Sequence, residues 1–236
     1  MLSKSQAKTF FWIGTGLCFI AFIGLSIDTF QRIPSQTHQG KLTPEAIQGK
    51  HLFDKNNCMG CHTILGEGAY YAPELTKVFE RRGELFIRSV LKNPEAMFPG
   101  QRKMVNYHFT EEEITNLVQF LKWIGEMDLN GFPAKPDILP VGTSKANQSD
   151  IDSDITKKMP TVFKQTCTAC HQVNGVGGVV GPALDDVGLR RDSNYISKWL
   201  RDPYSLKIDS KMPKLQLTDE QIKELTLFLS ELKKGQ

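Results

Sequence analysis

Four of the five cysteines of this chain occur in two copies of one short pattern. The two copies are Cys58-Met-Gly-Cys61-His62 and Cys167-Thr-Ala-Cys170-His171. In each copy two thiols stand three positions apart and a histidine follows directly. This spacing suits the two vinyl groups of one porphyrin, which form thioethers with the cysteines while the imidazole binds the iron. The sequence therefore predicts two covalently attached haem c groups.

A zinc site and a redox-active disulfide also use paired cysteines of this spacing. A zinc site built from four cysteines would need both pairs in one place, yet the pairs lie more than a hundred residues apart. Each pair also has its own histidine and its own helical pattern. Together with the export across a membrane that the N-terminus predicts, these features favour covalent haem over both alternatives.

Each motif has a candidate for the second axial ligand of its iron, which in cytochromes c is often methionine. Met104 follows the first motif histidine by 42 positions, and Met212 follows the second by 41. Met212 precedes a proline, which stiffens the expected ligand loop, whereas Met104 precedes a valine. Met97 and His108 are the local rivals for the first iron, and a histidine ligand would lower its reduction potential.

The elements that must position these ligands are predicted to be helices. Two capping boxes, Thr110-x-x-Glu113 and Thr218-x-x-Gln221, each open an amphipathic run after a candidate methionine. Another helix begins at Pro44, ahead of the first motif, and Gly49 gives it room for a close crossing. Its counterpart in the second half begins near Pro160 and is shorter. The predicted fold class is therefore all-α, with two small α-helical cytochrome c domains after a transmembrane helix.

The N-terminus reads as a membrane anchor. From Phe10 to Ile27 eighteen residues carry no charge, and Asp28 ends the run. Lys4 and Lys8 precede it, and basic flanking residues usually stay on the cytoplasmic side. A cleaved signal peptide is the alternative, but no small-x-small cleavage site follows the run. We therefore expect a single-pass protein of the cytoplasmic membrane with both haem domains on the periplasmic side.

The remaining organisation follows from composition. Between the two halves, residues 131–153 contain three prolines, three serines and no apolar period, which is typical of a linker. The expected segments are a cytoplasmic N-terminus (1–9), a transmembrane anchor (10–28), a connector (29–43), a first cytochrome c domain (44–130), the linker (131–153) and a second cytochrome c domain (154–236). Lys and Arg number 29 against 26 Asp and Glu, so no basic excess favours nucleic acid as a partner.

Four stretches of the first half carry a family resemblance. They are Asn56–His62 (NNCMGCH), Gly66–Leu75 (GEGAYYAPEL), Phe79–Gly83 (FERRG) and Phe120–Trp123 (FLKW). With the anchor, residues 1 to about 132 resemble the small cytochrome c subunit of bacterial nitric oxide reductase. The GEGAYYAPEL stretch is the specific part, because a general cytochrome c does not need that loop. The chain departs from the family in two ways: its Met104 lacks the usual following proline, and a second haem domain follows the first.

The resemblance implies an electron-transfer role with the catalytic site on another subunit. That partner would be a large, multi-span subunit whose b-type haems and non-haem iron reduce nitric oxide to nitrous oxide. Electrons would come from a soluble cytochrome c, a cupredoxin or a membrane quinol-oxidising complex, and would pass from the second haem to the first. The resemblance also implies that Gly68 and Tyr70 help to bind a structural calcium ion shared with the large subunit.

Two other functions stay open on the sequence alone. The chain could be the dihaem subunit of a terminal oxygen reductase, although the GEGAYYAPEL stretch argues against it. It could also be a free-standing dihaem periplasmic enzyme such as a peroxidase. That function would require one iron to be open or differently ligated.

Overall fold

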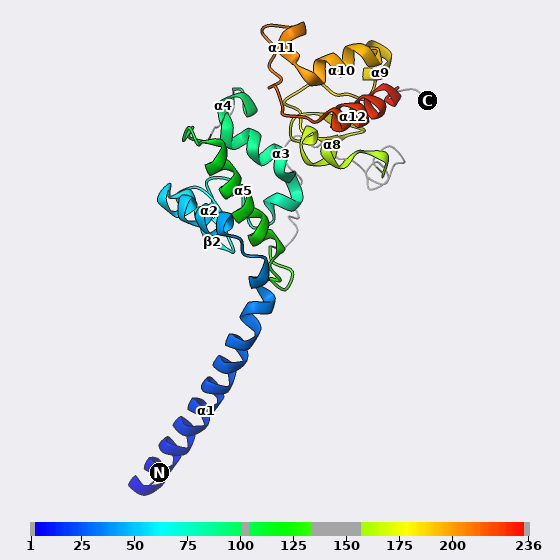
Figure 1. Cartoon of the computed structure of the whole chain (residues 1–236). Coiled ribbons are helices and arrows are strands. Elements are labelled where there is room, and N and C mark those ends of the chain that lie inside the picture. Colours follow the sequence, from blue (N-terminus) through cyan, green and yellow to red (C-terminus); the bar gives the residue numbers. More distant parts are fainter. Residues whose placement is uncertain (1–2, 101–103, 134–156, 234–236) are drawn as a thin grey trace.

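The computed structural model of the chain describes residues 3–100, 104–133 and 157–233. These residues form mainly helices, so the predicted all-α class is confirmed, and two short antiparallel β-pairs are added to it. A long N-terminal helix projects from the first of two helical domains, and the second domain lies beyond the first (Figure 1). Apart from its first three residues, the predicted linker lies outside the described part of the chain.

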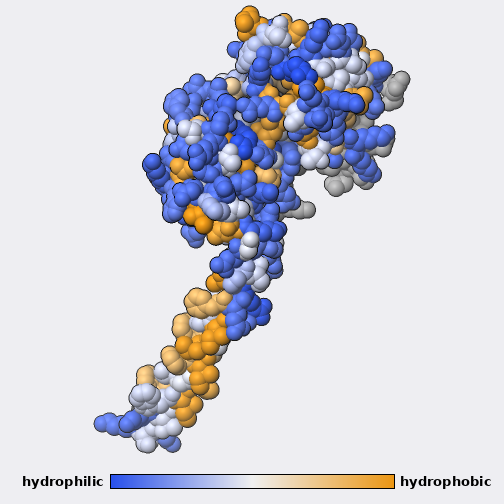
Figure 2. Space-filling model, viewed as in Figure 1, coloured by the Kyte–Doolittle hydropathy of each residue, from blue (hydrophilic) through white to orange (hydrophobic). Residues whose placement is uncertain are grey.

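The projecting helix, α1 (Lys4–Gln36), begins with a capping box in which Ser3 and Gln6 exchange side-chain and backbone hydrogen bonds. None of its residues is buried, and its middle forms an apolar band on the surface (Figure 2). Among the described residues it is the one helix long and apolar enough to cross a membrane. The helix continues past Asp28, which pairs with Arg32 at 2.9 Å, so part of the predicted connector is helical.

The end of α1 is tied to the first domain. The backbone N–H of Asp128 donates to the carbonyl of Gln36 at 2.9 Å. After a short 3-10 turn, η1 (Gln39–Lys41), the Lys41 ammonium pairs with Glu126 at 2.8 Å. These bonds join the end of α1 and the turn after it to the last turn of the domain's C-terminal helix and to the residues just after that turn.

The first domain has the helices that the sequence predicts around its motif. Its elements are α2 (Pro44–Lys55), η2 (Cys58–Gly60), β1 (Thr63–Ile64), β2 (Glu67–Gly68), α3 (Val78–Lys92), α4 (Pro94–Met97) and α5 (Glu111–Glu126). Thr43 caps α2 with proline at the first helical position, and Thr110 with Glu113 forms the predicted capping box of α5. Gly83, with φ of 68°, kinks α3 near its start.

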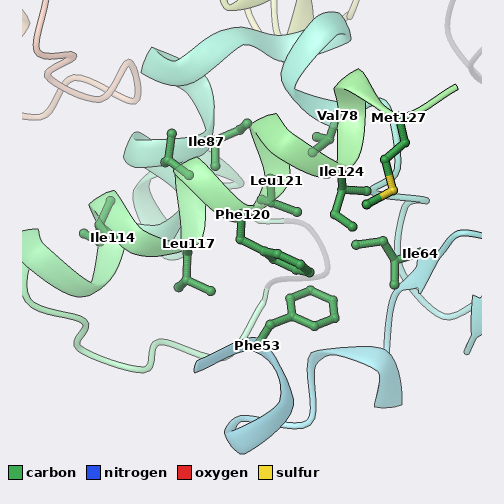
Figure 3. Close-up of a cluster of buried hydrophobic side chains, with 11 residues drawn as sticks. Phe53, Ile64, Val78, Ile87, Ile114, Leu117, Phe120, Leu121, Ile124 and Met127 are labelled. Carbon is green, nitrogen blue, oxygen red and sulfur yellow. The ribbon is translucent and has the colours of Figure 1, made fainter. Parts of the chain in front are cut away.

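The first domain's core lies where α2 crosses α5. The ring of Phe53 on α2 packs on that of Phe120 on α5, with centroids 5.4 Å apart (Figure 3). A side chain at Gly49 would bring its Cβ to 2.0 Å from the carbonyl oxygen of Asn116. Glycine at this position therefore allows the close crossing that the sequence predicts.

The second domain repeats this plan in a shorter form. Its elements are α8 (Thr161–Gln165), η3 (Cys167–Ala169), β3 (Gln172–Val173), β4 (Val176–Gly177), α9 (Val187–Arg190), α10 (Ser193–Arg201), α11 (Pro203–Leu206) and α12 (Asp219–Glu231). Pro160 immediately precedes α8, which is the shorter helix that the sequence predicts. Phe163 packs on Phe228 with centroids 5.0 Å apart, as Phe53 does on Phe120.

The two domains contact each other through α3 and α8. Leu85 of α3 packs against the hydrophobic core of the second domain. The side-chain amide of Gln165 donates to the carbonyl of Glu80 at 3.1 Å. A Cβ at Gly83 would lie 2.5 Å from the Gln165 side-chain oxygen, so this glycine lets the two helices approach.

Candidate haem sites

Each haem-attachment motif folds as one tight turn. The carbonyl of Cys58 accepts hydrogen bonds from the backbone N–H of Cys61 at 3.1 Å and of His62 at 2.9 Å. The second motif is closed by the same two bonds, again of 3.1 and 2.9 Å. The turn therefore brings both thiols and the imidazole of a motif together, as attachment of one porphyrin requires.

Both motif histidines are oriented by a proline carbonyl. Nδ1 of His62 lies 2.7 Å from the oxygen of Pro73, and Nδ1 of His171 lies 2.8 Å from that of Pro182. An Nδ1 that donates to a carbonyl leaves Nε2 with the lone pair that a metal needs. Burial lowers the pKa of His171, although the bond to Pro182 acts in the opposite direction, and the neutral ring is the form that binds iron.

The four motif cysteines are free thiols in the described structure, with no disulfide between them. Burial raises the pKa of Cys58 to about 11 and that of Cys167 to about 12. A redox-active cysteine usually has a depressed pKa instead. Within the described ranges no group of three or more His, Cys, Asp or Glu side chains could hold a metal ion. Each cysteine pair therefore lies in its own turn with its own histidine, as thioether attachment of one haem requires.

The two sites repeat each other bond by bond, with numbers shifted by 109, the separation of His62 and His171. In the first domain three backbone N–H groups donate to carbonyl oxygens: Ala69 to Met59, Ala72 to Cys61 and Leu75 to Thr63. The equivalent bonds of the second domain are Gly178 to Thr168, Gly181 to Cys170 and Leu184 to Gln172. Their lengths agree within each pair, at 2.9, 2.8 and 2.9 Å. The second domain therefore has the same local frame around its histidine as the first.

The candidate methionines occupy equivalent places in the two domains. Met104 lies six residues before Thr110, the N-cap of α5, and Met212 lies six residues before Thr218, the N-cap of α12. Both side chains are half-buried. Met212 packs against the same core as Cys167, which brings the expected ligand and the attachment motif of the second domain to one place.

The rival ligands of the first iron lie elsewhere in this frame. Met97 ends α4, whose N-cap is Asn93, and the matching position in the second domain is Leu206 at the end of α11. Met97 is 5% exposed while Leu206 is 41% exposed. His108 is exposed, with φ of 54°. Neither rival has an iron-binding residue at the equivalent place of the second domain, so the repeat favours Met104.

A tryptophan that no sequence motif singles out lies beside the second methionine. The indole Nε1 of Trp199, on α10, donates to the sulfur of Met212 at 3.0 Å. A thioether that binds iron through one lone pair keeps another for such a bond. Only the tertiary fold brings Trp199 to the ligand loop, so no local signal in the sequence reveals this contact.

The GEGAYYAPEL stretch forms β2 and the turn that follows it. Gly68 has φ of 112°, and a Cβ there would lie 2.3 Å from the carbonyl oxygen of His62. Gly177 holds the same position in the second domain, so the backbone of this loop is common to both domains and only its side chains differ. Tyr70 is 86% exposed, and its counterpart Val179 is 59% exposed. The side chains, rather than an added loop, are what is specific to the first domain.

Comparison with known proteins agrees with this repeat. The sequence model of the cytochrome c family matches residues 46–125 and again residues 157–233. The C subunit of nitric oxide reductase from Stutzerimonas stutzeri is 36% identical over 136 residues, covering 56% of this chain and 93% of that protein. The same subunit from Halomonas halodenitrificans is 35% identical, covering 57% and 96%. Cytochrome c oxidase subunit 2 of Alkalihalophilus pseudofirmus is 33% identical over 82 residues, which are 30% of this chain and 24% of that protein.

Two helical domains, each with a cysteine pair and an oriented histidine, define a cytochrome of the c type, and the chain belongs to the cytochrome c family. Within the cytochrome c family, the chain belongs to the nitric oxide reductase C subunits, and the match covers 93% and 96% of the length of the two relatives named above. The second domain is an addition to the length that those relatives share with it.

Proposed function

We propose that the chain is a membrane-anchored dihaem cytochrome that passes electrons from an external donor to the catalytic subunit of a nitric oxide reductase. Electrons pass from the second domain to the first and then to the partner. The catalytic site lies on that partner, a multi-span subunit with b-type haems and non-haem iron. The observation that carries the proposal is the bond-by-bond repeat of one attachment frame in a chain whose first half matches the C subunits of nitric oxide reductases.

The chain's own residues hold the two groups. In the first domain Cys58 and Cys61 form the thioethers, and His62 and Met104 bind the iron. In the second domain the same roles fall to Cys167, Cys170, His171 and Met212. Each haem c, when bound, supplies a one-electron couple. The proline carbonyls orient the histidines, and the bond from Trp199 holds the sulfur of Met212 in place.

The anchor and the exposed loop set the orientation of the complex. Helix α1 spans the cytoplasmic membrane, and both haem domains lie on its periplasmic side. The carbonyl of Gly68 and the hydroxyl of Tyr70 contribute to a structural calcium ion at the boundary with the large subunit. Hard oxygen donors of this kind suit calcium, and the exposure of Tyr70 leaves it available to a partner.

The test is to purify the tagged full-length chain from its native membranes in mild detergent and to assay the preparation. A large haem b subunit should copurify, and the preparation should consume nitric oxide when supplied with reductant. A chain that emerges alone contradicts the proposal. So does a chain that emerges with a partner that turns over oxygen only, which would favour an oxygen reductase such as the oxidase that the shorter match names.

A further inference from the structure

The first domain receives the second on one side of α3. We call the outer face of α3 the side formed by Arg82, Leu85, Phe86, Arg88, Ser89 and Lys92. Leu85 packs into the second domain's core, and the Arg82 guanidinium lies within electrostatic reach of Cys170. A cleft of about 640 Å³ continues the contact, lined by Leu85, Arg88 and Lys92 on one side and by Pro213 and Leu215 on the other. The attachment edge and the ligand loop of the second domain thus both face α3.

The second domain has the equivalent face on α10, with every number raised by 109. What we call the outer face of α10 is formed by Arg191, which precedes the helix, and by Asn194, Tyr195, Ser197, Lys198 and Arg201. The guanidinium of Arg191 lies 4.5 Å from the centre of the Tyr195 ring, as that of Arg82 lies 5.2 Å from Phe86. Arg201 pairs with Asp219 at 2.6 Å, as Lys92 pairs with Glu111.

This second face is open. A cleft of about 270 Å³ lies beside it, lined by Ser197, Arg201, Lys223 and the exposed Leu227. This cleft lies between α10 and α12, and among the described residues none of the first domain lines it, whereas the cleft on α3 is lined by residues of both domains. The helix face that one cytochrome domain occupies on α3 therefore has an equivalent on α10, which keeps the basic and aromatic residues at three of the six positions.

The open face also connects directly to the ligand of the second domain. The rings of Tyr195 and Trp199 stack with centroids 6.0 Å apart and planes 14° apart. Trp199 in turn donates to the sulfur of Met212. Two aromatic rings and one hydrogen bond therefore link the surface to Met212, which would hold the haem iron. Arg201 is the one residue of the outer face of α10 that also lines the cleft against α3.

We propose that the outer face of α10 is the docking site of a soluble c-type cytochrome, which presents its own haem-attachment edge there as the second domain does on α3. The inference rests on the proposed electron-transfer function and names the donor and its site. A second copy of the chain is the wrong occupant, because its second domain already has that edge against its own α3. A cytochrome is favoured over a cupredoxin because the equivalent face on α3 is occupied, among the described residues, by a cytochrome domain.

The charge and polarity of the face define the partner further. Arg191, Lys198 and Lys223 form no ion pair within the described residues, so the face attracts a donor with an acidic rim. Asn194 stands where the first domain has Leu85, so this contact lacks the apolar anchor of the intramolecular one. A polar, steered contact suits a donor that must dissociate after each electron.

The test uses the full-length holoprotein and the variant Arg191→Glu with Lys198→Glu. The matched control carries the same charge reversal on the exposed side of α2, Lys50→Glu with Lys55→Glu. The probe is an acidic soluble cytochrome c. Binding of its zinc-substituted form is measured by surface plasmon resonance, and reduction of the chain by its ferrous form is followed by stopped flow.

The α10 variant should bind the probe at least tenfold more weakly at low ionic strength and should be reduced correspondingly more slowly, while ascorbate with a small mediator reduces it normally. Unchanged binding, an equal loss in the α2 control, or tighter binding of a cupredoxin would overturn the assignment. Copurification of a nitric-oxide-consuming partner is scored in the same preparations, so failure of the docking site and failure of the proposed function are separate results.

Discussion

Two methionines compete for the first iron, and their burial and their position in the fold favour different choices. Met97 is almost fully buried, whereas Met104 is only half-buried. Position favours Met104, because it stands at the same distance from its C-terminal helix as Met212 does in the second domain. An apolar side chain that ends a short helix needs no role beyond filling the core.

Replacement of Met104 should therefore change the first haem, and replacement of Met97 should not. Met104→Leu removes the sulfur and should convert one of the two haems from low spin to high spin in the EPR spectrum of the oxidised protein. Met97→Leu conserves volume and should cost less than about 1.5 kcal/mol of stability without a change of spin state. The reverse pattern would assign the ligand to Met97.

Trp199 should set the reduction potential of the second haem. Trp199→Phe keeps an aromatic ring but removes the N–H that withdraws electron density from the Met212 sulfur. A hydrogen bond worth ~0.5–1.5 kcal/mol corresponds to a fall of about 20–60 mV in the midpoint potential, which a spectroelectrochemical titration would measure. The control is Trp123→Phe, on α5 of the first domain, which should leave that potential in place. A potential that stays constant in Trp199→Phe would show that the bond has no such effect.

At the scale of the elements, the crossing of α2 and α5 depends on a single glycine. Gly49→Ala would place a methyl group against the Asn116 carbonyl, and the helices would have to separate. Overpacking of this kind should lower the free energy of unfolding of the first domain by about 1–3 kcal/mol, measured by denaturant titration of its haem absorbance. Gly40→Ala, where a Cβ has open space around it, is the control. Equal stabilities of the two variants would contradict this account of the crossing.

The elements are largely predictable from the sequence because their signals are local. Capping boxes at Thr110 and Thr218, the proline at the start of α2 and the small residue at Gly49 each act within one helix or one crossing. The interface between the domains is not predictable in this way, since it joins Leu85 to Gln165 and Cys170, which lie at least 80 residues further along the sequence. The contact of Trp199 with Met212 escapes sequence analysis for the same reason.

The backbone shape of the GEGAYYAPEL loop is also not evident from its sequence, for a different reason. Its letters mark the family correctly, but they suggest a loop that a general cytochrome c lacks. The second domain builds the same turn from Gly177 to Pro182 with different side chains. Two loops of dissimilar residues can share one backbone shape, because the positive φ of Gly68 and of Gly177 fixes the turn and the residues that follow them do not.

At the scale of the whole molecule, Gly83 controls how closely the domains approach. Gly83→Ala strains a backbone with φ of 68° and drives a methyl group toward the Gln165 side chain. We expect weaker docking of the second domain, seen as a larger radius of gyration in X-ray scattering, and slower electron transfer between the domains after flash reduction. Gly100→Ala has a similar φ of 73° with open space around it, and it should leave both quantities near those of the unaltered chain. Equal effects of the two variants would mean that strain alone, and not the contact, is responsible.

The central claim is that one polypeptide carries two thioether-linked haems, and counting them tests it most directly. After extraction with acidified acetone, which removes any haem that is not covalently held, the pyridine haemochrome spectrum should give two c-type haems per chain. The count should fall to one when Cys58 and Cys61 are both replaced by alanine. A count of one or none in the unaltered chain would contradict the account.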